Sequence, residues 1–135
     1  MRKLDEKTNV INWFDLPVTD MARAKKFYET ILDIKMRTQY MEETDEELSF
    51  FPSVPGVIQA TSGRVSGALV RNSRLKPGSE GVLVYLNAAP SIRAVIDRIE
   101  PAGGKVISSV KKIVAGYICV FIDTEGNRVG LHSDA

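Results

Sequence analysis

Hydrophobic residues near the start of the chain follow two different periods. Residues 10–18 alternate in character, which predicts a β-strand with two distinct faces. The face with Trp13 and Asp15 mixes aromatic and charged groups, so we expect it to form the wall of a site. Residues 21–32 have apolar side chains at three- and four-residue spacing, which predicts an amphipathic helix whose first turn is capped by Thr19 or Asp20.

The same order of elements occurs twice along the chain. The first half is expected to continue with strands at about residues 35–42, 48–52 and 64–71, separated by an acidic turn at 42–47 and a loop at 52–63. The second half repeats the order with a strand at 82–88, a helix at about 90–99 and strands at 105–113, 117–122 and 128–133. We therefore predict an α+β fold of two βαβββ modules, about residues 8–72 and 80–135, within a single domain spanning 1–135.

Composition and charge exclude several classes of function. The 135 residues, 44% of them hydrophobic, suffice for one compact domain with a core. With 18 Lys and Arg against 17 Asp and Glu, no global field attracts nucleic acid. The sequence has a single cysteine, Cys119, and neither a signal-peptide pattern nor an apolar run that could span a membrane. We expect a soluble, cytoplasmic protein whose partner is a small organic molecule, with no nucleic acid and no membrane.

Several segments, in the expected order, resemble one known family. Residues 15–28, in which Asp20, Arg23, Phe27 and Tyr28 carry the likeness, resemble the opening strand and helix of the vicinal oxygen chelate superfamily, the glyoxalase/bleomycin resistance/dioxygenase proteins. The segments 66–70, 81–87, 102–105 and 121–132 are similar to later parts of the same fold. The resemblance implies curled mixed sheets that form a half-barrel cleft. Enzymes of the family hold a divalent metal there, which chelates two oxygens of the substrate.

The positions that hold metal ligands in the family carry other residue types in this chain. Alignment of the motifs places them on Trp13, at or beside Gly67, on Leu83 and on Gly130. Divalent metals bind imidazole and carboxylate groups, and indole, isobutyl or hydrogen side chains offer no such donor. We therefore predict no cofactor and no family-type metal. A displaced divalent-metal site built from Asp15 and His132 is the alternative.

Asp15 and His132 are the candidate catalytic residues. A carboxylate at Asp15, between two apolar residues on its own face of the strand, is expected to be partly buried and to have a shifted pKa. Its alternative roles are an ion pair with Arg128 or Arg64, or a hydrogen bond across a dimer interface. His132 is the only histidine and suits a general acid or base near neutral pH, or else a hydrogen-bonded group at a pocket rim.

The candidate ligand-binding residues combine aromatic and polar groups, as small-molecule sites do. They are Trp13, Tyr85, Asn87, Arg128 and Gly130. Trp13, Tyr85 and Tyr117 are expected to form an apolar pocket wall with a polar tip, or to belong to the core.

Two functions follow from these candidates. The first is a protein that binds a small organic molecule in the cleft between its modules, without the family metal. The alternative is a glyoxalase-like lyase, isomerase or dioxygenase that uses Asp15 with His132 or Tyr85 for proton transfer. We expect a homodimer, because family members complete their clefts from two chains or bury their sheet edges against each other.

Overall fold

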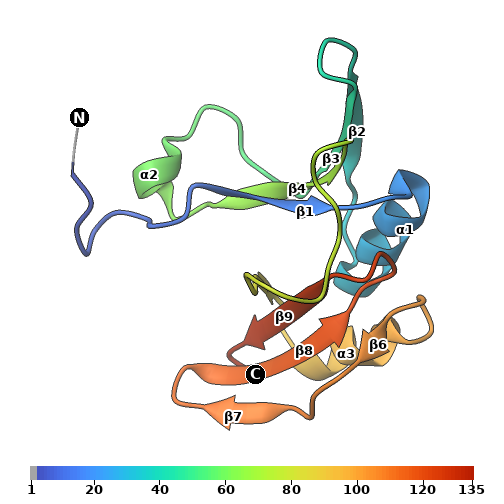
Figure 1. Ribbon diagram of the computed structural model, residues 1–135. Coiled ribbons are helices and arrows are strands. Elements are labelled where there is room, and N and C mark those ends of the chain that lie inside the picture. The colour runs from blue at the N-terminus through green and yellow to red at the C-terminus, as the bar shows by residue number, and fades with distance from the viewer. Residues whose placement is uncertain (1–2) are drawn as a thin grey trace.

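The computed structural model describes residues 3–135 as two sheets, each covered by a helix of its own (Figure 1). The elements of the first module are β1 (Trp13–Pro17), α1 (Met21–Leu32), β2 (Arg37–Met41), β3 (Glu46–Phe50), the short α2 (Gln59–Ser62) and β4 (Ser66–Arg71). Those of the second are β5 (Tyr85–Asn87), α3 (Ile92–Ile99), β6 (Lys105–Val106), β7 (Lys111–Ile113), β8 (Gly116–Ile122) and β9 (Arg128–Ser133). The expected α+β class is confirmed.

The two sheets have equivalent topologies. The first has the order β1-β4-β3-β2, with β1 parallel to β4 and the other pairs antiparallel. The second has β5-β9-β8, with β5 parallel to β9 and with β6 and β7 following each other along the far edge of β8. Neither sheet closes into a barrel. The βαβββ repeat expected from the sequence is therefore confirmed.

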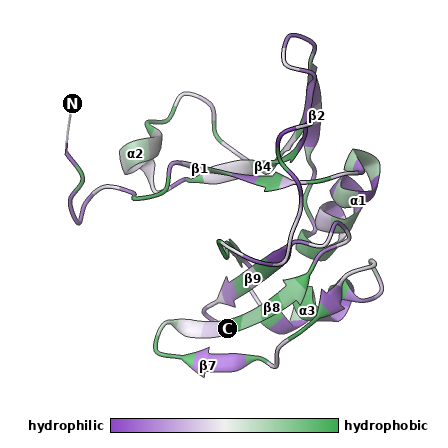
Figure 2. Ribbon diagram, in the orientation of Figure 1, coloured by the Kyte–Doolittle hydropathy of each residue, from purple (hydrophilic) through white to green (hydrophobic). Residues whose placement is uncertain are grey.

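Helix α1 forms where the sequence predicts it, because a capping residue precedes its first turn and its apolar residues lie on one face. The Asp20 side chain accepts a hydrogen bond from the backbone N–H of Arg23 at 3.0 Å, which caps the first turn. One side of the helix packs into the core through Met21, Ala24, Phe27, Tyr28 and Ile31. Burying a large apolar side chain of this kind contributes about 1.5–3 kcal/mol. Figure 2 shows that β2 and β7, two of the strands at the sheet edges, are largely hydrophilic.

The turn between β8 and β9 attaches the second module to the start of α1. The Glu125 carboxylate, with its side chain fully buried, accepts hydrogen bonds from the backbone N–H groups of Thr19 and Asp20, both at 2.8 Å. It also forms an ion pair with the Arg23 guanidinium at 2.7 Å. Burial opposes ionisation of this carboxylate, but the hydrogen bonds from Arg23, Asp20 and Thr19 outweigh it and lower the pKa of Glu125 to about 2.

A second set of contacts lies beneath this turn. The buried Tyr28 hydroxyl donates to the Asp123 carboxylate at 2.7 Å, and the Asn127 side-chain amide donates to the backbone carbonyl of Pro17 at 2.7 Å. Burial, together with the negative charge of Asp123, raises the pKa of Tyr28 well above its usual value. These contacts join the two modules through the end of β1 and helix α1 on one side and the turn between β8 and β9 on the other.

Three elements differ from the sequence-based expectation. Glu46 and Glu47, assigned to the acidic turn, begin β3 instead, and residues 59–62 of the expected loop form α2. The strand expected at 105–113 is split into β6 and β7, because the Ser108 hydroxyl accepts the hydrogen bond of the Val120 N–H at 2.8 Å, in place of a backbone carbonyl.

Within residues 3–135, no helix combines the length and apolar character needed to cross a membrane.

Candidate functional site

Strand pairing in the second sheet places the candidate residues of this module on one face. Tyr85 pairs with Gly130, and Asn87 pairs with His132, in the parallel register of β5 and β9. Because side chains on a strand alternate, Arg128, Gly130 and His132 share the same face of β9. The opposite face carries Leu86, Leu131 and Cys119, which are buried toward α3. The first face is therefore the open face of the second sheet.

Tyr85 and Gly130 fit together closely. A Cβ placed on Gly130 would lie 2.5 Å from Cδ1 of Tyr85, so the phenol ring covers the position where any larger residue would carry its side chain. Tyr85 and Gly130, both candidates from the sequence, are thus neighbours across the β5–β9 pair, and Leu83 lies two residues before β5 begins.

A pocket of about 480 Å³ lies on this open face. Its lining comes from β5, β7, β8 and β9 and consists of Tyr85, Leu86, Asn87, Ile113, Ile118 and His132. Ile118 lies directly beside His132 in the β8–β9 register. Ile113 of β7 and Ile118 of β8 were missing from the sequence-based candidates, since their face is known only from the register of β7 with β8 and of β8 with β9.

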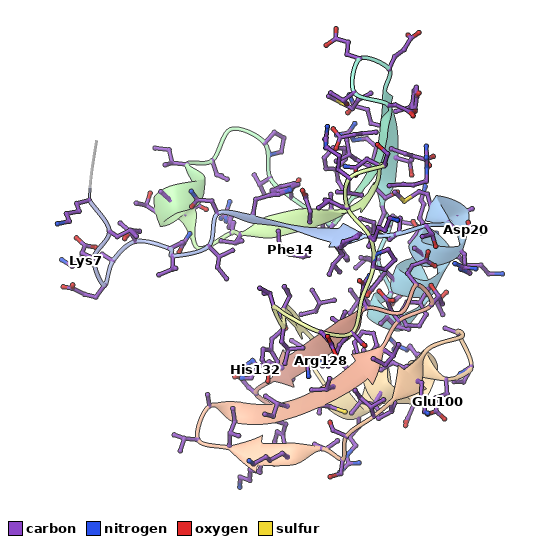
Figure 3. All side chains as sticks on the ribbon, in the orientation of Figure 1. Lys7, Phe14, Asp20, Glu100, Arg128 and His132 are labelled. Carbon is purple, nitrogen blue, oxygen red and sulfur yellow. The ribbon has the colours of Figure 1, made fainter. Side chains whose placement is uncertain are left out.

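A larger groove of about 900 Å³ runs between the two modules. Phe14, Leu32, Ile34 and Phe51 line it from the first module, and residues 82–87 line it from the second. Figure 3 shows Phe14 pointing from β1 toward the second module, and Arg128 and His132 along β9. Tyr85, Leu86 and Asn87 line both the groove and the pocket. The two hollows therefore meet at β5.

Trp13 and Asp15 lie on the other side of β1 from Phe14. They share a face, as the alternation predicts, and the Trp13 indole N–H donates to the Asp15 carboxylate at 3.0 Å. The Trp13 ring packs edge-on against Phe50, with centroids 6.1 Å apart. The expected partial burial of Asp15 is wrong, because this residue is exposed. Neither Arg128 nor Arg64 forms an ion pair with it among residues 3–135.

The remaining candidates are placed separately from Asp15. His132 Nε2 lies 2.7 Å from the backbone carbonyl oxygen of Ala115, the hydrogen-bonded arrangement considered as one alternative for this histidine. Asp15 and His132 belong to different sheets, and neither has the other as a hydrogen-bond partner within the described part of the chain. Tyr117 packs against the core through the helix-facing side of β8 and does not join Tyr85.

Arg128 is the polar residue of the open face with an unused donor. Its Nε is buried and has no hydrogen-bond partner among residues 3–135. Its backbone N–H donates to the carbonyl of Gly78 at 3.4 Å, which places the segment before β5 beside the start of β9. A buried donor without an acceptor is costly, and such groups in native proteins usually call for an explanation.

Comparison with known proteins identifies the family. The sequence model of the Glyoxalase/Bleomycin resistance protein/Dioxygenase superfamily matches residues 10–131, which is most of the chain. The chain belongs to this superfamily. No match was found among the curated proteins.

Solved structures of the superfamily share the fold with low sequence identity. The trypanothione-dependent glyoxalase I of Leishmania major superposes with a TM-score of 0.66 at 15% identity, covering 93% of this chain and 87% of that one. A glyoxalase/bleomycin resistance protein/dioxygenase domain from Frankia sp. EAN1pec gives 0.66 at 16% identity, covering 93% and 97%. A glyoxalase I mutant from Zea mays gives 0.64 at 21% identity, covering 90% of this chain and 46% of that one. This chain thus spans about half of the maize protein.

The residues at the superfamily's metal positions do not fit a divalent metal. At the middle-strand position, Gly67 has the Phe14 ring where its Cβ would be. Its neighbour Ser66, opposite Trp13, donates its hydroxyl to the Pro52 carbonyl at 2.9 Å. At Gly130 the Tyr85 ring fills the space of a carboxylate side chain. Within residues 3–135, no group of three His, Cys, Asp or Glu side chains is placed to hold a metal ion.

Proposed function

We propose that this member of the glyoxalase/bleomycin resistance/dioxygenase superfamily binds a small organic molecule where the inter-module groove meets the pocket of the second sheet. The observation that carries the proposal is the packing of Tyr85 over Gly130. The Tyr85 ring occupies the space where a metal-binding side chain at position 130 would lie. The pocket beside it is mostly apolar and is bordered by the Asn87 amide and the His132 imidazole. An apolar wall with a few polar groups is the usual composition of a small-molecule site.

Binding without the family metal agrees better with this site than catalysis by Asp15 and His132. General acid–base catalysis requires both groups within reach of one reacting atom. Here Asp15 is exposed on the first sheet, with the Trp13 indole as its partner, and His132 is hydrogen-bonded to Ala115 on the second. The donor groups needed for a Lewis-acid metal are absent from the superfamily's positions, as described above.

Nuclear magnetic resonance titration of the full chain with small neutral probes tests this function. Benzamide, benzyl alcohol and cyclohexanol are expected to shift the signals of Tyr85, Asn87, Ile118 and His132 together. Ile113→Trp should weaken this binding about tenfold or more by filling the pocket. Its matched control is Val114→Trp, because Val114 is the fully exposed neighbour. Shifts scattered over the surface, or equal loss in both variants, would contradict the proposal.

We also propose that the protein is a homodimer. Val10, Ile11 and Val82 are 84%, 57% and 88% exposed beside the groove, and β1 and β5 each pair along one edge only within residues 3–135. Unpaired edges and exposed apolar side chains are features that a second copy covers. Sedimentation equilibrium should give a dimer that Val82→Lys dissociates, while Val54→Lys, at an exposed residue outside the groove, does not. A monomeric wild-type chain would contradict this proposal.

A further inference from the structure

The open face of the second sheet carries the cationic residues Lys105, Lys111 and Arg128, and Lys112 points to the other face beside Tyr117. The strands β5 to β9 contain no aspartate or glutamate, and their charged residues are Lys105, Lys111, Lys112 and Arg128, together with the titratable His132. Three cross-strand rows make up this face. One row joins Lys111, Ile118, His132 and Asn87, the next joins Val120, Gly130 and Tyr85, and the last joins Lys105, Ile122 and Arg128.

Arg128 lies at one end of this face, at the start of β9 and one row from Tyr85, outside the lining of the pocket and the groove. It lies four residues before His132 on the same face, or roughly 13 Å along the strand, with Gly130 and the Tyr85 ring between them. Its buried Nε has no acceptor in the described part of the chain, and its guanidinium forms no ion pair there. Glu80, two residues beyond the Gly78 carbonyl that accepts from the Arg128 N–H, is exposed.

A guanidinium with an unused, desolvated donor is suited to a planar or tetrahedral anion. Carboxylates and phosphorus oxyanions present several oxygens to one arginine, and such charge-assisted hydrogen bonds are stronger than neutral ones. We propose that the molecule bound at this site carries an anionic group, a carboxylate or a phosphorus oxyanion, that binds Arg128 while its uncharged part packs on Tyr85. This inference rests on the proposed binding function and names the chemical class of its ligand.

Three probes of similar shape test the inference on the full chain at constant ionic strength. They are benzoate, phenylphosphonate and the neutral benzamide, and binding is followed through the Arg128 Nε–Hε signal and through the signals of Tyr85 and His132. At least one anion should bind about tenfold or more tightly than benzamide, the effect of one charge-assisted hydrogen bond. Which anion binds more tightly distinguishes a carboxylate from a phosphorus oxyanion.

Matched variants separate Arg128 from the general positive charge of the face. Arg128→Met keeps an unbranched stem for packing and should abolish the preference for the anion, whereas Arg128→Lys should retain part of it. Arg64→Met removes the same charge from an exposed residue of the first module and should leave the preference unchanged. Equal loss in Arg64→Met and Arg128→Met would overturn the inference.

The outcomes distinguish the inference from the function on which it rests. If benzamide binds beside Tyr85 as tightly as the anions do, the ligand class is wrong and the proposed function stands. If neither the anions nor benzamide shift the signals of Tyr85 and His132, both fail. An anion preference that depends on Arg128 supports both.

Discussion

Two neighbouring parts of the β8–β9 hairpin differ in whether their buried charged groups have hydrogen-bond partners. In the turn, the Glu125 carboxylate is fully buried and accepts hydrogen bonds from Thr19, Asp20 and Arg23. Three residues later, the Nε of Arg128 is buried and has no partner among residues 3–135. The chain therefore satisfies the polar groups that hold its modules together and leaves a donor unused on its open face.

This contrast explains why the family is easier to identify than the function. The segments that carry the likeness to the family meet at the contact between the modules. They are the segment around Asp20, Arg23 and Tyr28 and the segment around Asp123 and Glu125. They specify how the fold is assembled. The open face, where a ligand would bind, differs from the superfamily pattern at the metal positions, so membership of the superfamily does not select a reaction.

The largest expected effect is on the contact between the modules. Glu125→Ala removes the acceptor of two backbone N–H groups and leaves the Arg23 guanidinium without its partner, so the free energy of unfolding should fall by about 3 kcal/mol. Urea denaturation measures this change. Glu43→Ala, at an exposed turn residue, is the control and should change stability by less than about 0.5 kcal/mol. Equal effects of the two substitutions would show that the turn does not hold the modules together.

The same carboxylate gives a pH dependence. Its pKa is lowered from the usual 4.5 to about 2 in the folded chain, so its contribution to stability is complete above about pH 4.5 and is lost as the pH falls toward 2. Unfolding followed between pH 5 and pH 2 should therefore show a steeper loss of stability in the wild type than in Glu125→Gln. Parallel curves for the two proteins would contradict the lowered pKa.

A smaller effect is expected at the Tyr85–Gly130 contact. Gly130→Ala places a methyl group against the Tyr85 ring and should destabilise the protein by about 1–3 kcal/mol, whereas the same substitution in a Tyr85→Ala background should cost less than about 1 kcal/mol. Gly78→Ala is the control, because nothing lies within 4 Å of a Cβ at that position. Additive effects in the double-mutant cycle would mean that the ring does not cover Gly130.

The smallest effect concerns Asp15. Because this carboxylate is exposed and its partner is the neighbouring Trp13 indole, Asp15→Asn should change the free energy of unfolding by less than about 0.5 kcal/mol. It should also leave the binding of benzamide unchanged. A clear loss of benzamide binding in Asp15→Asn would show that Asp15 belongs to the binding site and would favour the alternative, enzymatic function.

The sequence predicts most of the elements because their signals are local. The stripe of α1 and its Asp20 cap, the alternation in β1 and the turn before β9 each lie within a dozen residues, and the structure places them as expected. The short α2 was missed because residues 59–62 have no side-chain cap and only one turn.

The site was predicted less well because it depends on register between distant strands. Tyr85 lies beside Gly130, and Ile118 lies beside His132, through pairings that no local pattern specifies. The split between β6 and β7 depends on one hydroxyl, that of Ser108, which replaces a backbone acceptor. Arg128 was a candidate from the sequence, but its unpaired Nε is visible only in three dimensions.

We propose above all that the chain binds a small organic molecule beside Tyr85 without the superfamily's metal. Native mass spectrometry of the full chain, purified without chelator and compared with the denatured chain, tests it most directly. We expect an organic ligand that is released on denaturation, with no divalent metal. One equivalent of zinc, nickel or iron retained by the native protein would contradict it.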